Sequence, residues 1–386
     1  MFALGGRTPT HRGGPIIAFH FAKLAVKRIE RNMAAMEAGI QFHLPTYAHV
    51  DLPHLIGLAK LAEAKGVTEI WATDNLRSRN TFVTLAALAS HLKIKLGTAV
   101  TAQYFRNPVD LADMVASISE LMEGRELSIG LGRGNPRTHN FVKTPRPVSM
   151  LRETAQSLRR LLDGDAVCFA DYPSLLSYFN FNPKARFKLD FSPKTPIRLY
   201  CGSNGPLGMA VGGKYMDGLI FGGHYIAALR TGRVPSLLQS FDDAATQTGK
   251  GPGVPRVAEI KISLSQDREA AQEFVKESAG RRVLNMYRQG YTHEDIQRLG
   301  VNLQDVARLD RAEREEASQA DFDRLVTNDM IDAIFIAGEP GDCLERLIGV
   351  RDTAQAQGFQ QLMFSELGPD VDEALGLLCD DIIPSL

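Results

Sequence analysis

The chain has 386 residues, of which 44% are hydrophobic and 23% are charged. Its 44 Lys and Arg residues balance 45 Asp and Glu residues, which gives a formal net charge of −1. This balance argues against a protein that neutralises nucleic-acid phosphates or attaches to an acidic membrane surface. No apolar run approaches the ~18 residues that a membrane-spanning helix needs, so the composition indicates a soluble globular protein.

Four cysteines are dispersed along the chain, without a C-x-x-C pair and without a histidine at metal-ligand spacing. This pattern indicates reduced thiols in a cytoplasmic protein and gives no reason to expect a zinc or other metal site. The cysteines are Cys168, Cys201, Cys343 and Cys379.

Residues 1–36 differ from the rest of the chain. Residues 1–35 hold six Lys or Arg residues against one acid, Glu30, and contain two glycine pairs. We expect this basic leader to lie outside the fold, with a signal or transit peptide as the alternative. Residues 37–386 are then expected to form one domain.

From residue 37 onward, short apolar runs alternate with amphipathic stretches, which is typical of repeated strand–helix units. Several runs are continuously apolar, as expected for parallel strands that are buried on both faces. Asn107 followed by Pro108 predicts a helix start, because Asn caps free amides and Pro fits the first turn. The predicted strands are residues 39–44, 67–73, 94–100, 127–131, 197–201, 218–221, 258–264 and 360–364.

Eight predicted strands alternating with helices favour a closed (β/α)8 TIM barrel, an α/β fold, over an open sheet. Such a barrel needs roughly 250 residues, so the surplus is expected in insertions. Residues 165–194 are rich in Pro and aromatic residues, and residues 280–328 are polar and charged. We expect insertions near these two stretches, the second as helices that cap one end of the barrel.

A barrel of this class places its ligands at the carboxyl ends of the strands. The sharpest candidate there is the stretch GSNGP at residues 202–206, between a buried strand and a helix. Free backbone N–H groups and the positive end of the helix would face an anion, which predicts a phosphate site. The alternative is an ordinary turn with a helix cap.

The segment GLGRG at residues 130–134 follows the fourth predicted strand. Its G-x-G-x-G spacing differs from the G-x-G-x-x-G of dinucleotide-binding folds, and no glycine opens a helix directly after it. We expect these glycines instead to let a flat ligand lie close against the end of the strand.

Seven blocks of sequence together resemble the bacterial luciferase-like family of flavin and deazaflavin oxidoreductases. They are IWATD (70–74), IKLGTAV (94–100), RNP (106–108), EGR with GLGRG (123–134), RE with LLDG (152–164), GP with MDG (205–218) and AG with P (337–340). The segment DNLRSRN (74–80) and the RPV before Arg152 are most similar to the methylenetetrahydromethanopterin reductase branch. The resemblance covers nearly all of the chain after the leader.

The resemblance implies that FMN or coenzyme F420 binds at the barrel mouth and that hydride is transferred at its ring. FMN would imply a monooxygenase that acts with O₂, and F420 a reductase or dehydrogenase. A non-prolyl cis peptide between Ala99 and Val100 is also implied, behind a ring that lies near Asp74 and Gly132; an ordinary trans peptide is the alternative. The phosphate would be held by Ser203, Asn204, Gly205 and Pro206.

Two positions depart from the deazaflavin enzymes that transfer protons, where a His and an acid are common; here they are Asn75 and Asn135. An Asn side chain orients a substrate carbonyl but cannot act as a general acid or base near neutral pH. His43 is therefore the titratable catalytic candidate, with His139 and His224 as alternatives. Each of these histidines has a positioning or surface role as the other interpretation.

Asp74 has two interpretations. It accepts a hydrogen bond from the cofactor's edge, or it caps the following segment or pairs with Arg77. Arg106 is expected to hold loops together through a carboxylate. Arg79 and Arg133 are candidates for an anionic substrate or cofactor tail.

We therefore expect a cytoplasmic luciferase-like oxidoreductase with a small-molecule substrate and without a nucleic-acid or membrane partner. Family members often form dimers, which makes a homodimer the expected state. Two alternatives stay open. One is a non-catalytic flavin-binding protein, and the other is an unrelated barrel enzyme that binds a phosphorylated metabolite at the same anion site.

Overall fold

The computed structural model describes residues 36–134, 141–251, 253–288 and 290–386. Apart from Met36, the expected leader lies outside the described residues, and so do the candidates Asn135 and His139. Residues Glu37–Leu386 form one compact unit. In the described part of the chain, no helix is both long and apolar enough to cross a bilayer.

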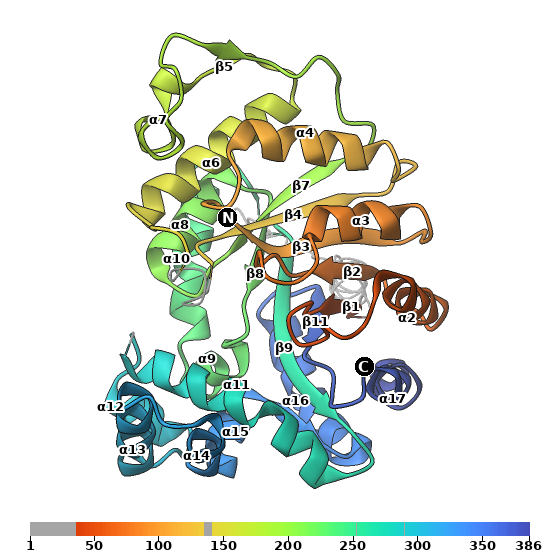
Figure 1. Cartoon of the computed structure of the whole chain (residues 1–386), viewed down its shortest axis with the longest axis vertical. Coiled ribbons are helices and arrows are strands. Elements are labelled where there is room, and N and C mark those ends of the chain that lie inside the picture. Colours follow the sequence, from red (N-terminus) through yellow and green to blue (C-terminus); the bar gives the residue numbers. More distant parts are fainter. Residues whose placement is uncertain (1–35, 135–140, 252, 289) are drawn as a thin grey trace, which may run out of the picture. The chain divides into compact units, whose positions relative to one another are not determined.

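Eight parallel strands close into a barrel, which confirms the predicted fold class (Figure 1). Each strand pairs with the next along the chain, β11 pairs with β1, and all eight predicted strands are present with ends shifted by at most two residues. The barrel strands are β1 (Glu37–Phe42), β2 (Glu69–Ala72), β3 (Lys95–Ala102), β4 (Leu127–Gly132), β7 (Ile197–Gly202), β8 (Gly218–Phe221), β9 (Arg256–Leu264) and β11 (Gln361–Ser365).

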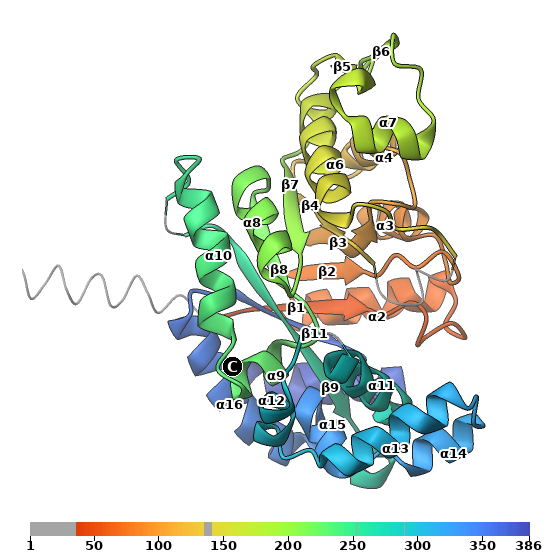
Figure 2. The ribbon, with the colours of Figure 1, turned by 90° about the vertical axis from the view of Figure 1, so that its left-hand side faces the viewer.

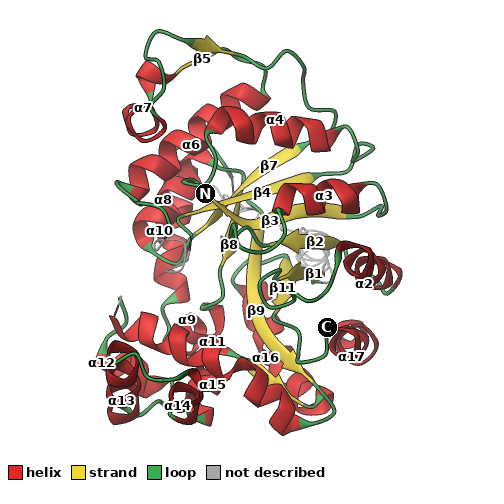
Figure 3. Ribbon diagram, in the orientation of Figure 1, coloured by secondary structure: helices red, strands yellow, loops and turns green. Residues whose placement is uncertain are grey.

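Helices cover the outside of this barrel (Figure 3). The predicted helix start at Asn107 is confirmed, because its side chain accepts hydrogen bonds from the Val109 and Asp110 amides at 3.0 Å each. The helices between successive strands and after β11 are α2 (Leu52–Ala64), α3 (Thr81–Ala89), α4 (Pro108–Ser119), α6 (Pro147–Leu162), α8 (Pro206–Tyr215), α9 (Tyr225–Arg230), α10 (Val234–Thr246), α16 (Pro340–Ala356) and α17 (Val371–Leu377). A short π-helix, η2 (Leu378–Ile382), and a single 3-10 turn, η3 (Ile383–Ser385), follow α17.

Two insertions extend the barrel, and Figure 2 shows them at opposite ends of the molecule. The first, between α6 and β7, holds the turn η1 (Phe169–Asp171), the helix α7 (Pro173–Phe179) and an antiparallel pair, β5 (Val167–Cys168) with β6 (Arg186–Phe187). The second, between β9 and α16, holds α11 (Arg268–Arg288), α12 (His293–Arg298), α13 (Leu303–Arg314), α14 (Gln319–Arg324), α15 (Asn328–Ile334) and β10 (Ile336–Gly338).

Strand β10 is absent from the sequence prediction. It pairs with the last three residues of β9, with Ile336 opposite Ile262 and Gly338 opposite Leu264. The earlier part of β9 pairs with β8 and β11 inside the barrel. One long strand therefore belongs both to the barrel and to the second insertion.

The barrel interior is a packed core rather than a channel. The Trp71 and Tyr200 rings meet edge to face with centroids 5.6 Å apart. At the amino ends of the strands, Trp71 Nε1 donates to Gln361 Oε1 at 2.9 Å, and Gln361 Nε2 donates to Glu69 Oε2 at 3.0 Å. Ser128 Oγ donates to the other Glu69 oxygen at 2.7 Å. The functional site is therefore expected at the carboxyl ends of the strands, the opposite end of the barrel.

Replacing Glu69 with glutamine is expected to flatten the pH dependence of stability. Burial raises the pKa of Glu69 from 4.5 to about 7, against the opposing effects of Lys95 and Ser128. Between these values the folded protein binds the proton more tightly than the unfolded chain, so the free energy of unfolding falls as the pH rises, by roughly 3 kcal/mol in total. Urea denaturation at stepped pH measures this, and parallel curves for the two proteins would contradict it.

Candidate functional site

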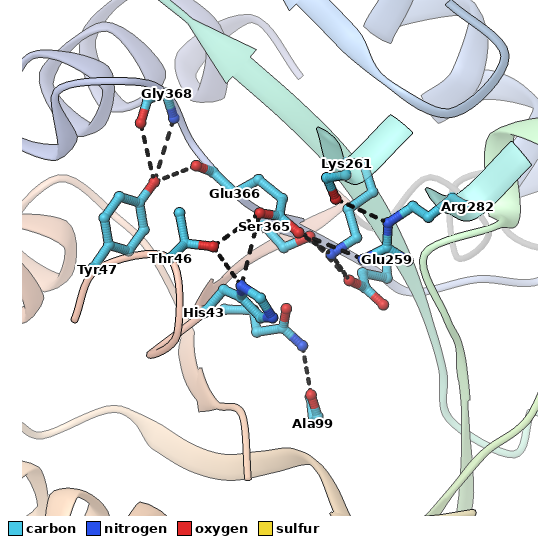
Figure 4. A network of polar contacts seen from close by, with 12 residues as sticks. His43, Thr46, Tyr47, Ala99, Glu259, Lys261, Arg282, Ser365, Glu366 and Gly368 are labelled. Atoms are coloured by element: carbon cyan, nitrogen blue, oxygen red, sulfur yellow. Dashed lines mark hydrogen bonds and ion pairs between the residues drawn. The ribbon is translucent and has the colours of Figure 1, made fainter. Parts of the chain in front are cut away.

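Side chains from three elements and one loop meet in a buried network of charged groups (Figure 4). Lys261 Nζ lies 2.7 Å from Glu259 Oε1 and 3.0 Å from Glu366 Oε1. Arg282, from α11, lies 3.5 Å from the same Glu366 oxygen. Two acids thus face two bases, and each carboxylate has a cationic partner within the network.

The strand period explains how β9 supplies two of these groups. Alternate residues of a strand point to the same face, so Glu259 and Lys261 follow Val257 of the core into the barrel. In the pairing with β11, Lys261 stands opposite Ser365, and Glu366 comes directly after it. Ser365 Oγ donates to Glu259 Oε1 at 3.0 Å. The network therefore lies at the carboxyl end of β11.

The charges in this network are mutually compensated. Burial raises the pKa of Glu366, but the neighbouring charges of Lys261 and Arg282 outweigh it and hold that pKa well below its usual range. The pKa of Glu259 is also lowered, since Lys261 and Arg282 outweigh the effect of burial. Both carboxylates are therefore ionised near neutral pH.

Two of the three candidate histidines, His43 and His224, adjoin this network. Burial lowers the pKa of His43 to about 4, although the nearby Glu366 opposes the change. Burial and the positive charge of Arg282 lower the pKa of His224 to about 3. Both rings are thus neutral near neutral pH, and neutral imidazole is the form that accepts a proton.

The loop after β1 is tied to the segment after β11. His43 Nδ1 lies 2.6 Å from Thr46 Oγ1, and Thr46 Oγ1 donates to Glu366 Oε2 at 3.1 Å. The buried Tyr47 hydroxyl donates to the carbonyl oxygen of Glu366 and accepts from the Gly368 amide, the latter at 3.3 Å. These bonds fix His43 relative to the network.

The peptide bond between Ala99 and Val100 is cis, as the family resemblance implies. The pairing of β3 with β4 shifts register between Thr98 and Thr101, on either side of this bond. Gln41 Nε2, from β1, donates to the Ala99 carbonyl oxygen at 2.5 Å. The side chain of Val100 is only partly buried.

The glycines that are expected to let a flat ligand lie close against the fourth strand surround the side chain of Val100. A Cβ atom on Gly132 would lie 2.7 Å from Val100 Cγ2, and one on Gly202 would lie 2.5 Å from Val100 Cγ1. The glycines therefore make room for the Val100 side chain. A ligand on this side of the mouth would meet Val100 before it met Gly132.

Asp74 is held by two partners. Its carboxylate forms an ion pair with Arg106 and accepts a hydrogen bond from Thr101 Oγ1 at 2.7 Å. Arg106, and not Arg77, is thus its cationic partner among the described residues. Arg106 also lies over the Phe82 ring, with Cζ 4.8 Å from the centroid. The loop-holding role expected for Arg106 is observed.

Asn75 begins the turn after β2. Its Oδ1 accepts from the amides of Arg77 and Ser78, each at 3.1 Å. Orientation of a substrate carbonyl by Asn75 stays a prediction and would use its Nδ2 group. Arg79, a candidate for binding an anionic tail, donates to the Tyr47 and Ala48 carbonyl oxygens, at 3.4 and 3.3 Å. Arg133 lies exposed just after β4.

The predicted phosphate-binding elbow joins β7 to α8. Gly205 is the N-cap of α8 and Pro206 its first residue, and no side chain caps the helix. Ser203 Oγ accepts from the Gly205 amide at 3.3 Å, and Asn204 Oδ1 accepts from the Gly222 amide at 3.0 Å. Because no side chain hydrogen-bonds to the start of the helix as a cap, its first amides are suited to an anion.

Two buried oxygens near the ends of β1 and β2 lack hydrogen-bond partners in the described part of the chain. They are Gln41 Oε1 and Thr73 Oγ1. Buried polar atoms are almost always paired, so atoms left without partners suggest that a polar ligand completes them. A flavin or deazaflavin ring, with N–H and C=O groups on its edge, fits this requirement.

A family model described as luciferase-like monooxygenase matches residues 35–357. The chain belongs to this family. It is accordingly an oxidoreductase, as the sequence analysis expects.

The similar proteins and solved structures bear the names of reductases and monooxygenases. The 5,10-methylenetetrahydromethanopterin reductase of Archaeoglobus fulgidus is 27% identical over 359 residues, which cover 91% of this chain and 100% of the relative. The coenzyme F420-dependent tetrahydromethanopterin reductase of Methanopyrus kandleri has a TM-score of 0.72 at 21% identity, over 91% of this chain and 99% of its own. The FMN complex of the oxygenating constituent of 3,6-diketocamphane monooxygenase from Pseudomonas putida scores 0.56 at 18% identity, over 91% and 98%. These two structural likenesses establish the shared barrel.

Sequence reasoning missed three members of the charged network in this luciferase-like protein. Glu259 and Lys261 lie inside a predicted strand, and Arg282 lies in a predicted insertion without a motif. One signal was available: two opposite charges at alternate positions of an otherwise apolar strand point to the same buried face. Nothing in the sequence indicates that Arg282 returns to the barrel.

Proposed function

We propose that this luciferase-like oxidoreductase uses coenzyme F420 and transfers hydride between the deazaflavin ring and a small organic substrate. The observation that carries the proposal is the match to methylenetetrahydromethanopterin reductases, which extends over 91% of this chain and 100% of the relative. The bound deazaflavin would supply the hydride chemistry, and the protein would supply position and electrostatics.

The chain offers groups for both ends of such a cofactor. The amides at the start of α8, with Ser203, would hold its phosphate. Gln41 Oε1 and Thr73 Oγ1 would bond to the polar edge of the ring, because both atoms are buried without a described partner. Val100 would contact the ring's face, since its side chain stands partly exposed over the glycines of β4 and β7.

Titration of the apoprotein with F420 and with FMN, each followed by fluorescence, tests the cofactor. We expect F420 to bind at least about tenfold more tightly, a difference of about 1.4 kcal/mol. Tighter binding of FMN, with oxygen consumption once the ring is reduced, would contradict the proposal and favour the monooxygenase that the family description names. Binding without turnover of any tested donor or acceptor would favour the non-catalytic flavin-binding protein.

Replacing Gly205 with aspartate is expected to weaken cofactor binding at least about tenfold without loss of stability. No atom lies within 4 Å of a Cβ at Gly205, and Asp is a favourable N-cap. The added carboxylate would repel the cofactor's phosphate. Gly205→Asn is the matched neutral control, so equal affinities for the two variants, measured by the same titration, would place the phosphate elsewhere.

A further inference from the structure

A short chain of polar side chains links His43 to the charged network through Thr46 and Glu366 (Figure 4). The Thr46 amide donates to the His43 carbonyl oxygen at 2.9 Å, so the turn folds Thr46 back onto the ring. Thr46 Oγ1 then lies 2.6 Å from His43 Nδ1 and 3.1 Å from Glu366 Oε2. One hydroxyl proton thus has two possible acceptors.

The charges decide which acceptor receives that proton. The ionised carboxylate of Glu366 only accepts hydrogen bonds. Its Oε1 accepts from Lys261 at 3.0 Å and from Arg282 at 3.5 Å, which leaves Oε2 for Thr46. Because Thr46 gives its single proton to Glu366, its oxygen must accept from His43. His43 therefore carries its proton on Nδ1, and its Nε2 is unprotonated.

The backbone after β11 is adapted to this arrangement. Strand alternation directs Ser365 into the barrel and would direct Glu366 away from it. Glu366 and Leu367 instead adopt left-handed backbone conformations, with φ of 75° and 46°. Such conformations cost a non-glycine residue about 1–2 kcal/mol each, and they cluster at functional sites. Here they bring the side chains of Ser365 and Glu366 into the same network.

We infer that Thr46 and Glu366 are positioning residues that hold His43 as its Nδ1–H tautomer, so that Nε2 exchanges a proton with the substrate. The inference rests on the proposed hydride transfer. His43 Nε2 has no hydrogen bond to any residue within the described ranges, and burial keeps the ring neutral with a pKa of about 4.

In this proposal His43 accepts a proton from the substrate while the bound deazaflavin serves as the oxidant. The electron pair of a substrate C–H bond would leave as hydride, which the bound oxidised deazaflavin would accept. The proton of the adjacent O–H or N–H bond passes to Nε2, and a C=O or C=N bond forms. In the reverse direction the imidazolium would return the proton to the substrate, and the bound reduced cofactor would supply the hydride. The substrate class is therefore a carbon that bears a hydroxyl or amino group.

The tautomer is measured directly by NMR of the full chain labelled with ¹⁵N-histidine, without cofactor, near neutral pH. The chain has nine histidines, so the His43 signals are identified by their loss in His43→Gln. We expect Nδ1 to be protonated in the wild type. In Glu366→Gln, the new carbonyl oxygen should stay with Lys261 and the amide should donate to Thr46. The Thr46 proton would then turn to His43, and the tautomer would invert to Nε2–H.

Thr46→Val and Thr46→Ser form the matched pair. Valine removes the hydroxyl and should give mixed tautomers, while serine should keep Nδ1–H. A protonated Nε2 in the wild type, or an unchanged tautomer in both Glu366→Gln and Thr46→Val, would overturn the inference. With turnover established, Glu366→Gln should lower kcat about 100-fold and leave KM nearly unchanged. Failure to bind F420 would refute the proposed function alone, because the tautomer is read without it.

Discussion

Replacing Lys261 with methionine is expected to destabilise the protein by at least about 3 kcal/mol, because two buried carboxylates lose their shared partner. The Lys261 side chain is 2% exposed and lies within 3.0 Å of both Glu259 and Glu366. Arg282 alone would remain to compensate them among the described neighbours. Urea denaturation of the two proteins measures the loss.

The pH dependence of that loss identifies its cause. In the wild type, the lowered pKa of Glu366 contributes stability above the carboxyl's usual pKa, and this contribution is lost as the pH falls. Without Lys261, the pKa values of Glu259 and Glu366 in the folded variant rise. As the pH falls, these carboxylates therefore take up protons in the variant before they do so in the wild type, and the variant loses its uncompensated buried charge. The difference in stability should therefore be largest at about pH 8 and narrow toward about pH 5.

Lys93→Met is the control for Lys261→Met. It breaks an ion pair with Glu123 whose side chains are 70% and 64% exposed, and it should leave stability within experimental error. A Lys261→Met variant as stable as this control, or a difference that does not change with pH, would show that the network is not electrostatically coupled.

Replacing Gly130 with alanine is expected to cost about 3 kcal/mol or more, the upper end of what overpacking costs. The new methyl group would overlap the Thr98 carbonyl oxygen and lie 2.9 Å from both Val100 Cγ1 and Ile220 Cδ1. The overlap with backbone can be relieved only if β3 and β4 move apart. Val100 would shift with β3, so cofactor affinity should fall as well.

Chemical denaturation and cofactor titration of the same preparation measure both effects. Gly349→Ala is the matched control, because Gly349 is exposed in α16 with no atom within 4 Å of a new Cβ. That change should stabilise the protein by about 1 kcal/mol. Equal unfolding midpoints for Gly130→Ala and the wild type would mean that the strands tolerate the methyl group.

The fold was accessible from sequence because its signals are local. Each barrel strand is a short apolar run between amphipathic stretches, and Asn107 with Pro108 marks a helix start by its own hydrogen bonds. Strand β10 has only three residues and pairs with the far end of β9. A run that short carries no period, so its existence depends on a partner that the sequence does not reveal.

The site was less accessible because its contacts join distant segments. Arg77 is one of the partners that the sequence suggests for Asp74, but Asp74 pairs with Arg106, 32 residues away. Lys261 and Glu366 are 105 residues apart. Glu366 reaches the network through a left-handed backbone conformation, which the sequence does not predict because no glycine stands at this position. Sequence could name His43 as a candidate, but its proton's location follows only from the hydrogen bonds of Thr46.

Strand β9 belongs both to the barrel and to the second insertion, and this limits how segments can be exchanged between enzymes of this fold. The residue after Lys261 already pairs with β10, and Arg282 enters the network from α11 of the same insertion. Exchanging the second insertion for one from another barrel would remove Arg282 and the pairing of β10 with β9, the strand that carries Lys261. A chimera that keeps the charged network would therefore need its junction after Arg282, and it would need to retain β10.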